Sequence, residues 1–337
     1  DFRAMSAPLW IDSKGSKDPQ HTNGGFHNFL EYVGTDGYIT TEFVDDRITS
    51  YGPTYAEITM DYLTDDGKIK VSYTHIEMPQ TDENRTFYVC TYEFLDDLTI
   101  TDSKRNFSFY SVTGRYVDYG KLGYLDKNNI PRIVDNTLTG SAYYILGNKS
   151  PYFDCFKWMS TSEDPNTKND YVNVGCLVYN YNVQMGGKPF NGGLGLYVED
   201  GWAHLTLNAD ELNFKKGDKI SLNLILVPWG SQESDYNRAD ADWNVRQIRE
   251  NTLLDPITIT VANGEKVESV YVPRVKSLDG KSAEFTLSGG ENNVAFEVQG
   301  IKSIGRPVLY EKNKNGEWEV YNYTSSETPD TPVLMKR

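Results

Sequence analysis

The sequence predicts an all-β protein: a large antiparallel β-sandwich with one surface helix, followed by a small β-sandwich-like domain. Three observations predict this class. The 337 residues include 24 Tyr, 14 Phe and 6 Trp, and aromatic side chains pack well on pleated sheets. Runs of alternating apolar and polar residues recur, separated by Gly, Asn and Asp. The length suits two domains, or one large β-body with an appendage.

The body is expected to begin with an irregular segment. Its first 35 residues are rich in Gly, Asp, Asn and Lys, which favour loops. Strands are then expected as far as residue 113, because apolar and polar residues alternate there. These strands are Tyr38–Ile48, Thr54–Leu63, Ile69–Met78, Thr86–Leu95 and Phe107–Thr113.

One turn in this part is clearly marked. Asp65-Asp66-Gly67-Lys68 lies between two alternating runs, and Asp-Gly supplies the positive φ angles that a tight hairpin turn requires. A hairpin is therefore expected here.

The middle of the chain continues with strands and ends in a helix. Six strands are expected: Ala142–Leu146, Tyr152–Trp158, Tyr171–Asn182, Leu194–Glu199, Trp202–Leu207 and Lys219–Pro228. Strands this numerous exceed a single seven-stranded sandwich and predict two large sheets packed face to face. The polar segment Asp235–Asn251, with Trp243 and Ile248 as apolar anchors, predicts one surface helix.

Shorter strands are expected after Pro256. They are Ile257–Val261, Val267–Val272, Ala283–Leu287, Asn293–Val298, Pro307–Lys312 and Trp318–Tyr323, with Asn-Gly, Asp-Gly and Gly-Gly turns between them. We interpret residues 1–255 as the sandwich-type body. Residues 256–337 are interpreted as a small C-terminal β-domain, or as a sheet that completes the body.

Charge and hydropathy restrict the partners. The net charge of −15 and a pI near 4.8 would repel nucleic-acid phosphates and anionic lipids, so no nucleic-acid partner is expected. A local groove lined by Arg or Lys could still bind a polyanionic glycan. No stretch reaches the roughly 18 apolar residues of a membrane span, so no membrane-spanning segment is expected.

No cofactor is expected, although acidic clusters would suit calcium. Asp45-Asp46, Asp96-Asp97 and the group Asp240, Asp242 and Glu250 are the candidates, and none has the spacing of an EF-hand loop. The three cysteines, Cys90, Cys155 and Cys176, match no zinc or redox spacing. They are expected to be buried thiols, with a Cys155–Cys176 disulfide as the alternative.

Motifs for zinc hydrolases, serine hydrolases and nucleotide enzymes are absent from the sequence, so candidate sites are small groups of residues. His75 and Glu77 are two residues apart on an expected strand and therefore share a face with Val71 and Tyr73. They would serve as an acid–base couple acting on a sugar, or as a general base with the partner that orients it. The alternative is a polar, solvent-facing hairpin edge.

Three further groups are candidate substrate-binding residues. His21 and His27 flank a Gly-rich segment that would line a site or form an N-terminal loop. Arg47, Tyr51 and Tyr55 surround a turn and would bind a uronate carboxylate, or a tyrosine among them would donate the proton that β-elimination requires. The alternative is that these tyrosines only pack on the surface. Trp202 follows the turn Glu199-Asp200-Gly201 and is the best candidate for an exposed ring that stacks on a sugar, with a core position as the alternative.

Two stretches resemble a known family. The run from Asn84 to Ile100, followed by Arg105–Tyr110, looks like strand pairs in galactose-mutarotase-like β-supersandwich domains of bacterial carbohydrate-active proteins. Phe214–Trp229, with a helix and a small sheet after it, is similar in order to their closing strands. In mutarotases a His and a Glu act on the sugar, but their motifs do not match this sequence residue by residue.

The resemblance extends over residues 1–255 and concerns architecture. It implies a protein that acts on or binds an extracellular polysaccharide or oligosaccharide, as a glycoside-modifying enzyme or a component of a polysaccharide lyase. The alternatives are a non-catalytic glycan-binding or accessory module and a structural surface-interaction protein. It also implies a secreted, periplasmic or cell-surface location for the chain, which is expected to be a processed product or a piece of a longer protein.

Overall fold

The computed structural model describes fourteen segments of the chain in two units. The described residues are 4–5, 26–28, 30–34, 37–51, 56–77, 86–113, 119–135, 141–147, 152–159, 170–199, 202–232, 257–289, 296–302 and 308–320. The first unit comprises 1–47, 58–75 and 83–253, and the second comprises 48–57, 76–82 and 254–337. Whether 256–337 forms a domain of its own stays a prediction.

The largest sheet has ten strands and follows the expected pattern. Its order is β13 (Pro131–Asp135), β12 (Tyr119–Leu125), β15 (Tyr152–Met159), β16 (Asp170–Met185), β21 (Lys219–Gln232), β8 (Thr86–Phe94), β7 (Ile69–Glu77), β6 (Ala56–Thr64) and β5 (Thr41–Tyr51), with β17 (Lys188–Pro189) paired to β16. The pairs from β13 to β8 are antiparallel.

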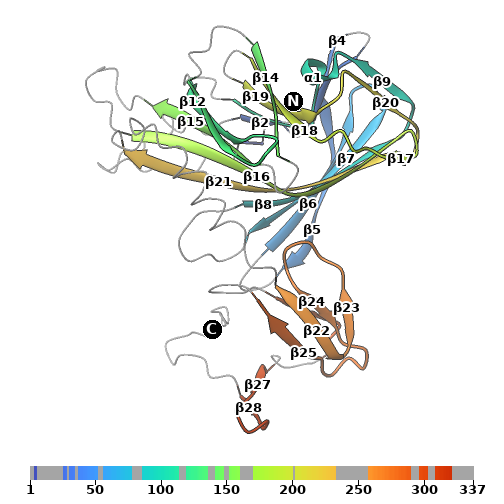
Figure 1. Ribbon diagram of the computed structural model, residues 1–337. Coiled ribbons are helices and arrows are strands. Elements are labelled where there is room, and N and C mark those ends of the chain that lie inside the picture. The colour runs from blue at the N-terminus through green and yellow to red at the C-terminus, as the bar shows by residue number, and fades with distance from the viewer. Residues whose placement is uncertain are drawn as a thin grey trace. The chain divides into compact units, whose positions relative to one another are not determined.

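A second, antiparallel sheet in the first unit has six strands. Its order is β1 (Ala4–Met5), β2 (Phe26–Asn28), β11 (Tyr110–Thr113), β19 (Trp202–Leu207), β18 (Leu194–Glu199) and β14 (Ser141–Ile145). Figure 1 shows β14, β18 and β19 lying over the long strands β16 and β21. Leu196 and Leu205 of this layer share one buried core with Leu222 and Leu224 of β21. The two-layer sandwich is therefore confirmed.

Smaller elements complete the first unit. They are the sheet β10 (Phe107–Ser108), β3 (Glu31–Gly34), β4 (Gly37–Ile39), the pair β20 (Glu211–Phe214) and β9 (Leu98–Thr101), and the helix α1 (Ser103–Asn106). Two expectations fail here. Strands β2 and β3 fall in the segment expected to be irregular, because their order comes from pairing with distant strands. The short α1 was not expected, since four residues carry no helical periodicity.

The second unit contains short sheets between its turns. These are the pair β22 (Thr258–Asn263) and β25 (Glu284–Ser288), the sheet β23 (Glu265–Val267), β24 (Arg274–Lys276), β26 (Glu297–Gln299), and the pair β27 (Tyr310–Lys312) and β28 (Trp318–Val320). The expected strand Val267–Val272 is wrong, because β23 ends at Val267. The helix expected over 235–251 lies outside the described residues.

The expected hairpin is confirmed between β6 and β7. Gly67 has a φ of 71°, and its N–H donates to the carbonyl of Thr64 at 2.7 Å. The Asp66 carboxylate accepts from the Thr64 hydroxyl at 2.8 Å and from the Lys68 N–H at 3.1 Å. The turn is thus closed by the residue types that predicted it.

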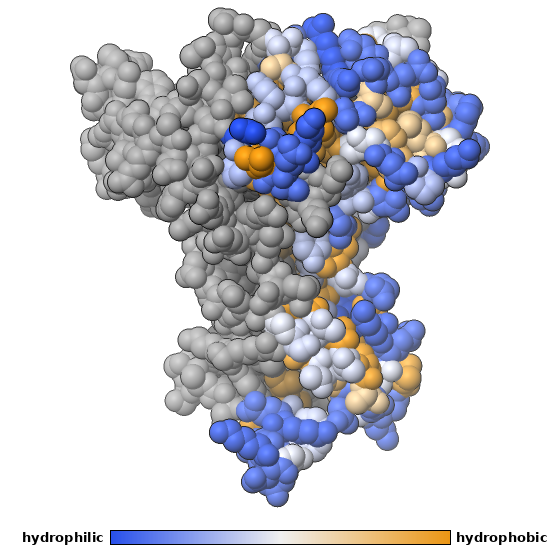
Figure 2. Space-filling view, in the orientation of Figure 1, coloured by the Kyte–Doolittle hydropathy of each residue, from blue (hydrophilic) through white to orange (hydrophobic). Residues whose placement is uncertain are grey.

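Most of the described surface seen in Figure 2 is hydrophilic, with scattered hydrophobic patches. Cys90 and Cys176 are buried, as expected of apolar core thiols. Within the described segments, no helix is long and apolar enough to cross a membrane. No three His, Cys, Asp or Glu side chains of those segments gather where they could hold a metal ion; Asp240, Asp242 and Glu250 lie outside them.

Candidate functional site

The structure places His75 and Glu77 near the end of β7. Val71 and Tyr73 on the same face are buried, His75 is half-buried and Glu77 is exposed, so this face emerges from the core along the strand. The His75 ring packs against Tyr88 of the neighbouring β8, with ring centroids 5.0 Å apart. The acid–base role of His75 and Glu77 stays a prediction.

Arg47 of β5 pairs with a carboxylate of the adjacent strand. Its guanidinium lies 2.8 Å from Asp61, whose carboxylate also has Lys70 at 3.7 Å and accepts from the Ser72 hydroxyl. Burial opposes ionisation of Asp61, but the Ser72 and Arg47 hydrogen bonds outweigh it and lower the pKa of Asp61. The charge of Arg47 is therefore directed at Asp61.

The other sequence candidates lie wholly or partly outside the described residues. His21 and Tyr55 are outside them, and the side chains of His27, Tyr51 and Trp202 are as well. The backbone of His27 lies on β2, opposite Val112, and that of Trp202 lies on β19, opposite Glu199. Their binding roles stay predictions.

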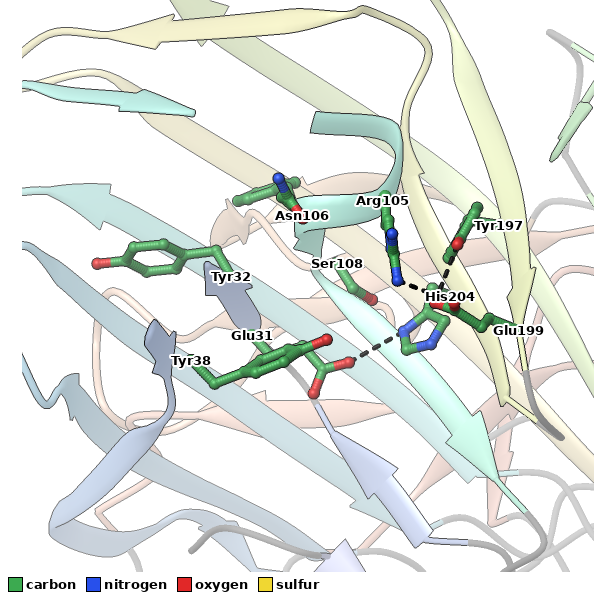
Figure 3. A pocket seen from close by; sticks show the side chains of 10 residues that line it. Glu31, Tyr32, Tyr38, Arg105, Asn106, Ser108, Tyr197, Glu199 and His204 are labelled. Carbon is green, nitrogen blue, oxygen red and sulfur yellow. Dashed lines mark hydrogen bonds and ion pairs between the residues drawn. The ribbon is translucent and has the colours of Figure 1, made fainter. Parts of the chain in front are cut away.

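A pocket in the first unit brings together side chains from the six-stranded sheet, the three-stranded sheet and α1. We call it the acidic pocket; its empty space of about 260 Å³ includes open solvent, and it is lined by Glu31, Tyr32, Tyr38, Arg105, Asn106, Phe107, Ser108, Tyr197, Glu199 and His204. Figure 3 shows Arg105, Tyr197, Glu199, His204 and Glu31 converging, with Tyr32 pointing away from them. None of these residues was a sequence candidate.

Glu199, at the end of β18, is fixed through both of its oxygens. Arg105 of α1 donates to Oε1 at 3.0 Å, and the Tyr197 hydroxyl donates to Oε2 at 2.9 Å. Burial is the largest cause and raises the pKa of Tyr197; the hydrogen bond to Glu199 also raises it, against an opposing effect of Ser141. This phenol therefore stays a donor at neutral pH. Tyr197 and Glu199 in turn raise the pKa of Arg105. The carboxylate is therefore held in one orientation.

His204 and Glu31 form the second pair of the pocket. Nδ1 of His204 lies 2.9 Å from Oε1 of Glu31, and both side chains are mostly buried. His204 lies opposite Tyr197 in β18 and Ser111 in β11, so sheet register sets its position. A carboxylate at Nδ1 orients an imidazole ring.

An exposed aromatic ring and two polar side chains also line the pocket. Tyr38 of β4 is 72% exposed and offers an aromatic surface at the rim. The Ser108 hydroxyl donates to the carbonyl of Tyr110 at 2.9 Å, and the Asn106 amide donates to that of Thr101 at 2.9 Å. These two groups therefore direct donors at backbone carbonyls of the protein itself.

Helix α1, which presents Arg105, is tied to the strand-end segment before β20. The Ser103 hydroxyl donates to the carbonyl of Ala209 at 2.7 Å, and Lys104 pairs with Asp210 at 2.6 Å. Asp102 precedes the helix with a φ of 48°, a conformation that Asp tolerates better than most residues. These contacts fix the direction from which Arg105 reaches Glu199.

Comparisons with known proteins give no family. No protein-family model and no curated protein matches the sequence. Among solved structures, the GH36 α-galactosidase AgaA from Geobacillus stearothermophilus is 10% identical with a TM-score of 0.38, covering 69% of this chain and 36% of AgaA. The α-galactosidase from Lactobacillus brevis is 9% identical with a TM-score of 0.37, covering 69% of this chain and 34% of that enzyme.

The chain thus spans about a third of the length of these α-galactosidases. A protein from Synechocystis, Slr1438, is 10% identical with a TM-score of 0.26, covering 66% of this chain and 84% of that protein. Similarities this low assign neither a family nor an activity. The function is therefore argued from the acidic pocket itself.

Proposed function

We propose that this chain is a carbohydrate-active protein that binds an oligosaccharide or polysaccharide in the acidic pocket. The observation that carries the proposal is the fixed Glu199 carboxylate, held by Arg105 and Tyr197 beside the His204–Glu31 pair. Hydrogen bonds to an ionised acceptor are about twice as strong as neutral ones. Because Glu199 is already oriented, sugar hydroxyls can bind it without a further ordering cost.

The exposed Tyr38 ring supplies the complementary apolar contact. Pyranose rings have apolar C–H faces as well as hydroxyl edges, and an aromatic ring with a polar tip suits such mixed surfaces. A sugar ring stacked on Tyr38 would thus reach the acidic pocket with its hydroxyl edge.

The same groups decide between a binding module and an enzyme. An imidazole oriented by a carboxylate can transfer a proton to or from a bound hydroxyl, and Glu199 would be the second carboxylate of a glycoside-modifying site. Binding without turnover needs only the fixed acceptors and Tyr38. We propose that saccharide binding is common to the module and the enzyme. In an enzyme or a polysaccharide lyase component, the bound saccharide would also be turned over.

Binding is tested by a glycan array followed by calorimetry with the whole chain. We expect Tyr38→Ala to weaken binding about tenfold, because an aromatic contact is lost at the rim. The matched control is Tyr310→Ala, which removes another exposed tyrosine, from the second unit, and should leave the affinity unchanged. Equal losses in the two variants, or no glycan bound by the native chain, would reject the proposal.

Turnover is measured separately on every glycan that binds. New reducing ends report hydrolysis, and absorbance from unsaturated uronates reports elimination. Binding with neither signal identifies a module. Turnover that survives both His204→Ala and Glu199→Gln would place the chemistry outside the acidic pocket.

A further inference from the structure

The acidic pocket has a surplus of negative charge. Its charged side chains are Glu31, Glu199, Arg105 and His204, so its wall has one net negative charge when histidine is counted as neutral. The net charge of the whole chain, −15, has the same sign. A cleft lined by one sign of charge raises the local concentration of ligands of the opposite sign.

Several donor groups of the pocket bind the protein itself, and the Glu199 carboxylate retains acceptor capacity. Arg105 is directed at Glu199, and the donors of Ser108 and Asn106 bind backbone carbonyls. The Tyr32 hydroxyl donates to Asp66 at 2.5 Å. Each Glu199 oxygen accepts one of these hydrogen bonds and has about two lone-pair sites. The pocket therefore suits a ligand that donates hydrogen bonds.

We infer that the sugar ring bound here carries a free amino group; this inference rests on the proposed function. An ammonium group brings three donors and a positive charge, and both match Glu199 and Glu31. A uronate carboxylate would meet two like charges, and Arg105, the arginine of the pocket wall, already pairs with Glu199. The resulting order of affinity is amino sugar, then neutral sugar, then uronate.

The order is tested with matched methyl glycosides of glucosamine, glucose and glucuronate, and with their galactose counterparts, by NMR titration of the whole chain. We expect glucosamine to bind about tenfold more tightly than glucuronate at low salt, with glucose between them. Raising NaCl from about 0.02 to about 0.5 M should narrow this range, because salt screens exposed charges.

Two variants assign the preference to one residue. Glu199→Gln keeps the shape of the side chain and should remove most of the preference for the amino sugar. Glu93→Gln is the control: it makes the same change at a 42% exposed carboxylate of β8 that pairs with Lys219 and does not line the pocket. It should leave the order unchanged.

The outcomes separate this inference from the function beneath it. Binding of glucuronate as tight as that of glucosamine, or a preference that Glu199→Gln leaves intact, overturns the inference alone. Failure of every glycoside and every arrayed glycan to bind rejects the proposed function. Thermal melts that match the native chain show that each variant is folded.

Discussion

Nδ1 of His204 lies 2.9 Å from Oε1 of Glu31, and this contact joins two separate sheets of the first unit. His204 belongs to β19 of the six-stranded sheet, and Glu31 belongs to β3 of the three-stranded sheet. Arg105 makes a comparable link from α1 to Glu199 of β18. The acidic pocket is therefore bordered by polar contacts between elements that do not share backbone hydrogen bonds.

The His204–Glu31 contact should be measurable as a coupling energy. We expect a double-mutant cycle with Glu31→Gln and His204→Ala to give about 1 kcal/mol, because a hydrogen bond inside a protein typically contributes about that much to stability. The free energy of unfolding in urea is the measurement. A coupling near zero would show that the pair orients the ring without stabilising the fold.

A second ionic cluster lies in the other unit and is more deeply buried. Arg274 hydrogen-bonds Glu57, whose side chain is 5% exposed, and its Nε lies 2.7 Å from Oε2 of Glu297. Burial raises the pKa of Glu57, although Arg274 acts to lower it. Removal from water therefore outweighs the neighbouring positive charge.

This raised pKa predicts a pH-dependent contribution to stability. The folded state holds the Glu57 proton more tightly than the unfolded state, so the stabilisation is present below pH about 4.5 and is lost as pH rises through the folded pKa. We expect Glu57→Gln to gain stability relative to the native chain between pH about 4 and about 7.5. Urea unfolding across that range is the measurement.

Glu319→Gln, on the exposed β28, is the control and should leave the pH profile unchanged. If the free energy of unfolding of the native chain instead rose with pH relative to that of Glu57→Gln, Arg274 rather than burial would determine the pKa of Glu57.

The β18 strand should be sensitive to volume at Gly195. A Cβ built there lies 1.9 Å from the Tyr143 hydroxyl and 2.3 Å from its Cζ, and the hydroxyl donates to Asn208 at 3.2 Å. We expect Gly195→Ala to lower the free energy of unfolding by about 1–3 kcal/mol, because the ring must move in a packed site.

A second substitution tests that explanation. Tyr143→Leu removes the clashing atoms, so Gly195→Ala should cost less in that background, with urea unfolding again as the measurement. An equal cost in both backgrounds would place the strain elsewhere in β18. Because Tyr197 and Glu199 lie on the same strand, the single variant should also weaken saccharide binding.

Local features of the fold could be predicted from the sequence. The Asp66-Gly67 turn and the alternating runs beside it depend on neighbouring residues only, and the structure confirms them. The spacing of His75 and Glu77 predicts a shared face, but it cannot reveal that Tyr88 of the next strand packs on the histidine ring. Alternation along a strand predicts which side chains share a face, but it does not predict which strand lies beside them.

The pocket could not be predicted, because its residues meet only through tertiary pairing. Glu31 falls in the segment expected to be irregular, and Arg105 is on a helix too short for a periodic pattern. His204 was one of only four histidines, and Glu199 preceded a recognisable Asp-Gly turn. Those two signals marked individual residues, but nothing in the sequence joined them.

Two neighbouring turns in the first unit are held by one buried carboxylate. Asp218 is 3% exposed, and its oxygens accept from the backbone N–H groups of Gly186, Gly187 and Lys215 at 2.7, 2.9 and 2.7 Å. Gly186 and Gly187 have φ angles of 62° and 72°, which aim both N–H groups at the carboxylate and favour glycine.

Replacing Asp218 should therefore cost more than replacing an exposed acid that accepts hydrogen bonds from the same turn. Asp218→Ala leaves three backbone donors without their acceptor, so we expect a loss of about 2–4 kcal/mol in the free energy of unfolding. Asp218→Asn keeps one acceptor oxygen and should lose less.

The matched control is Asp97→Asn, because Asp97 also accepts from this turn, at Lys216 N–H and Lys215 Nζ, but is 57% exposed. Urea unfolding followed by circular dichroism compares the three variants. If Asp97→Asn were as costly as Asp218→Ala, the number of hydrogen bonds rather than their burial would determine the stability of this turn.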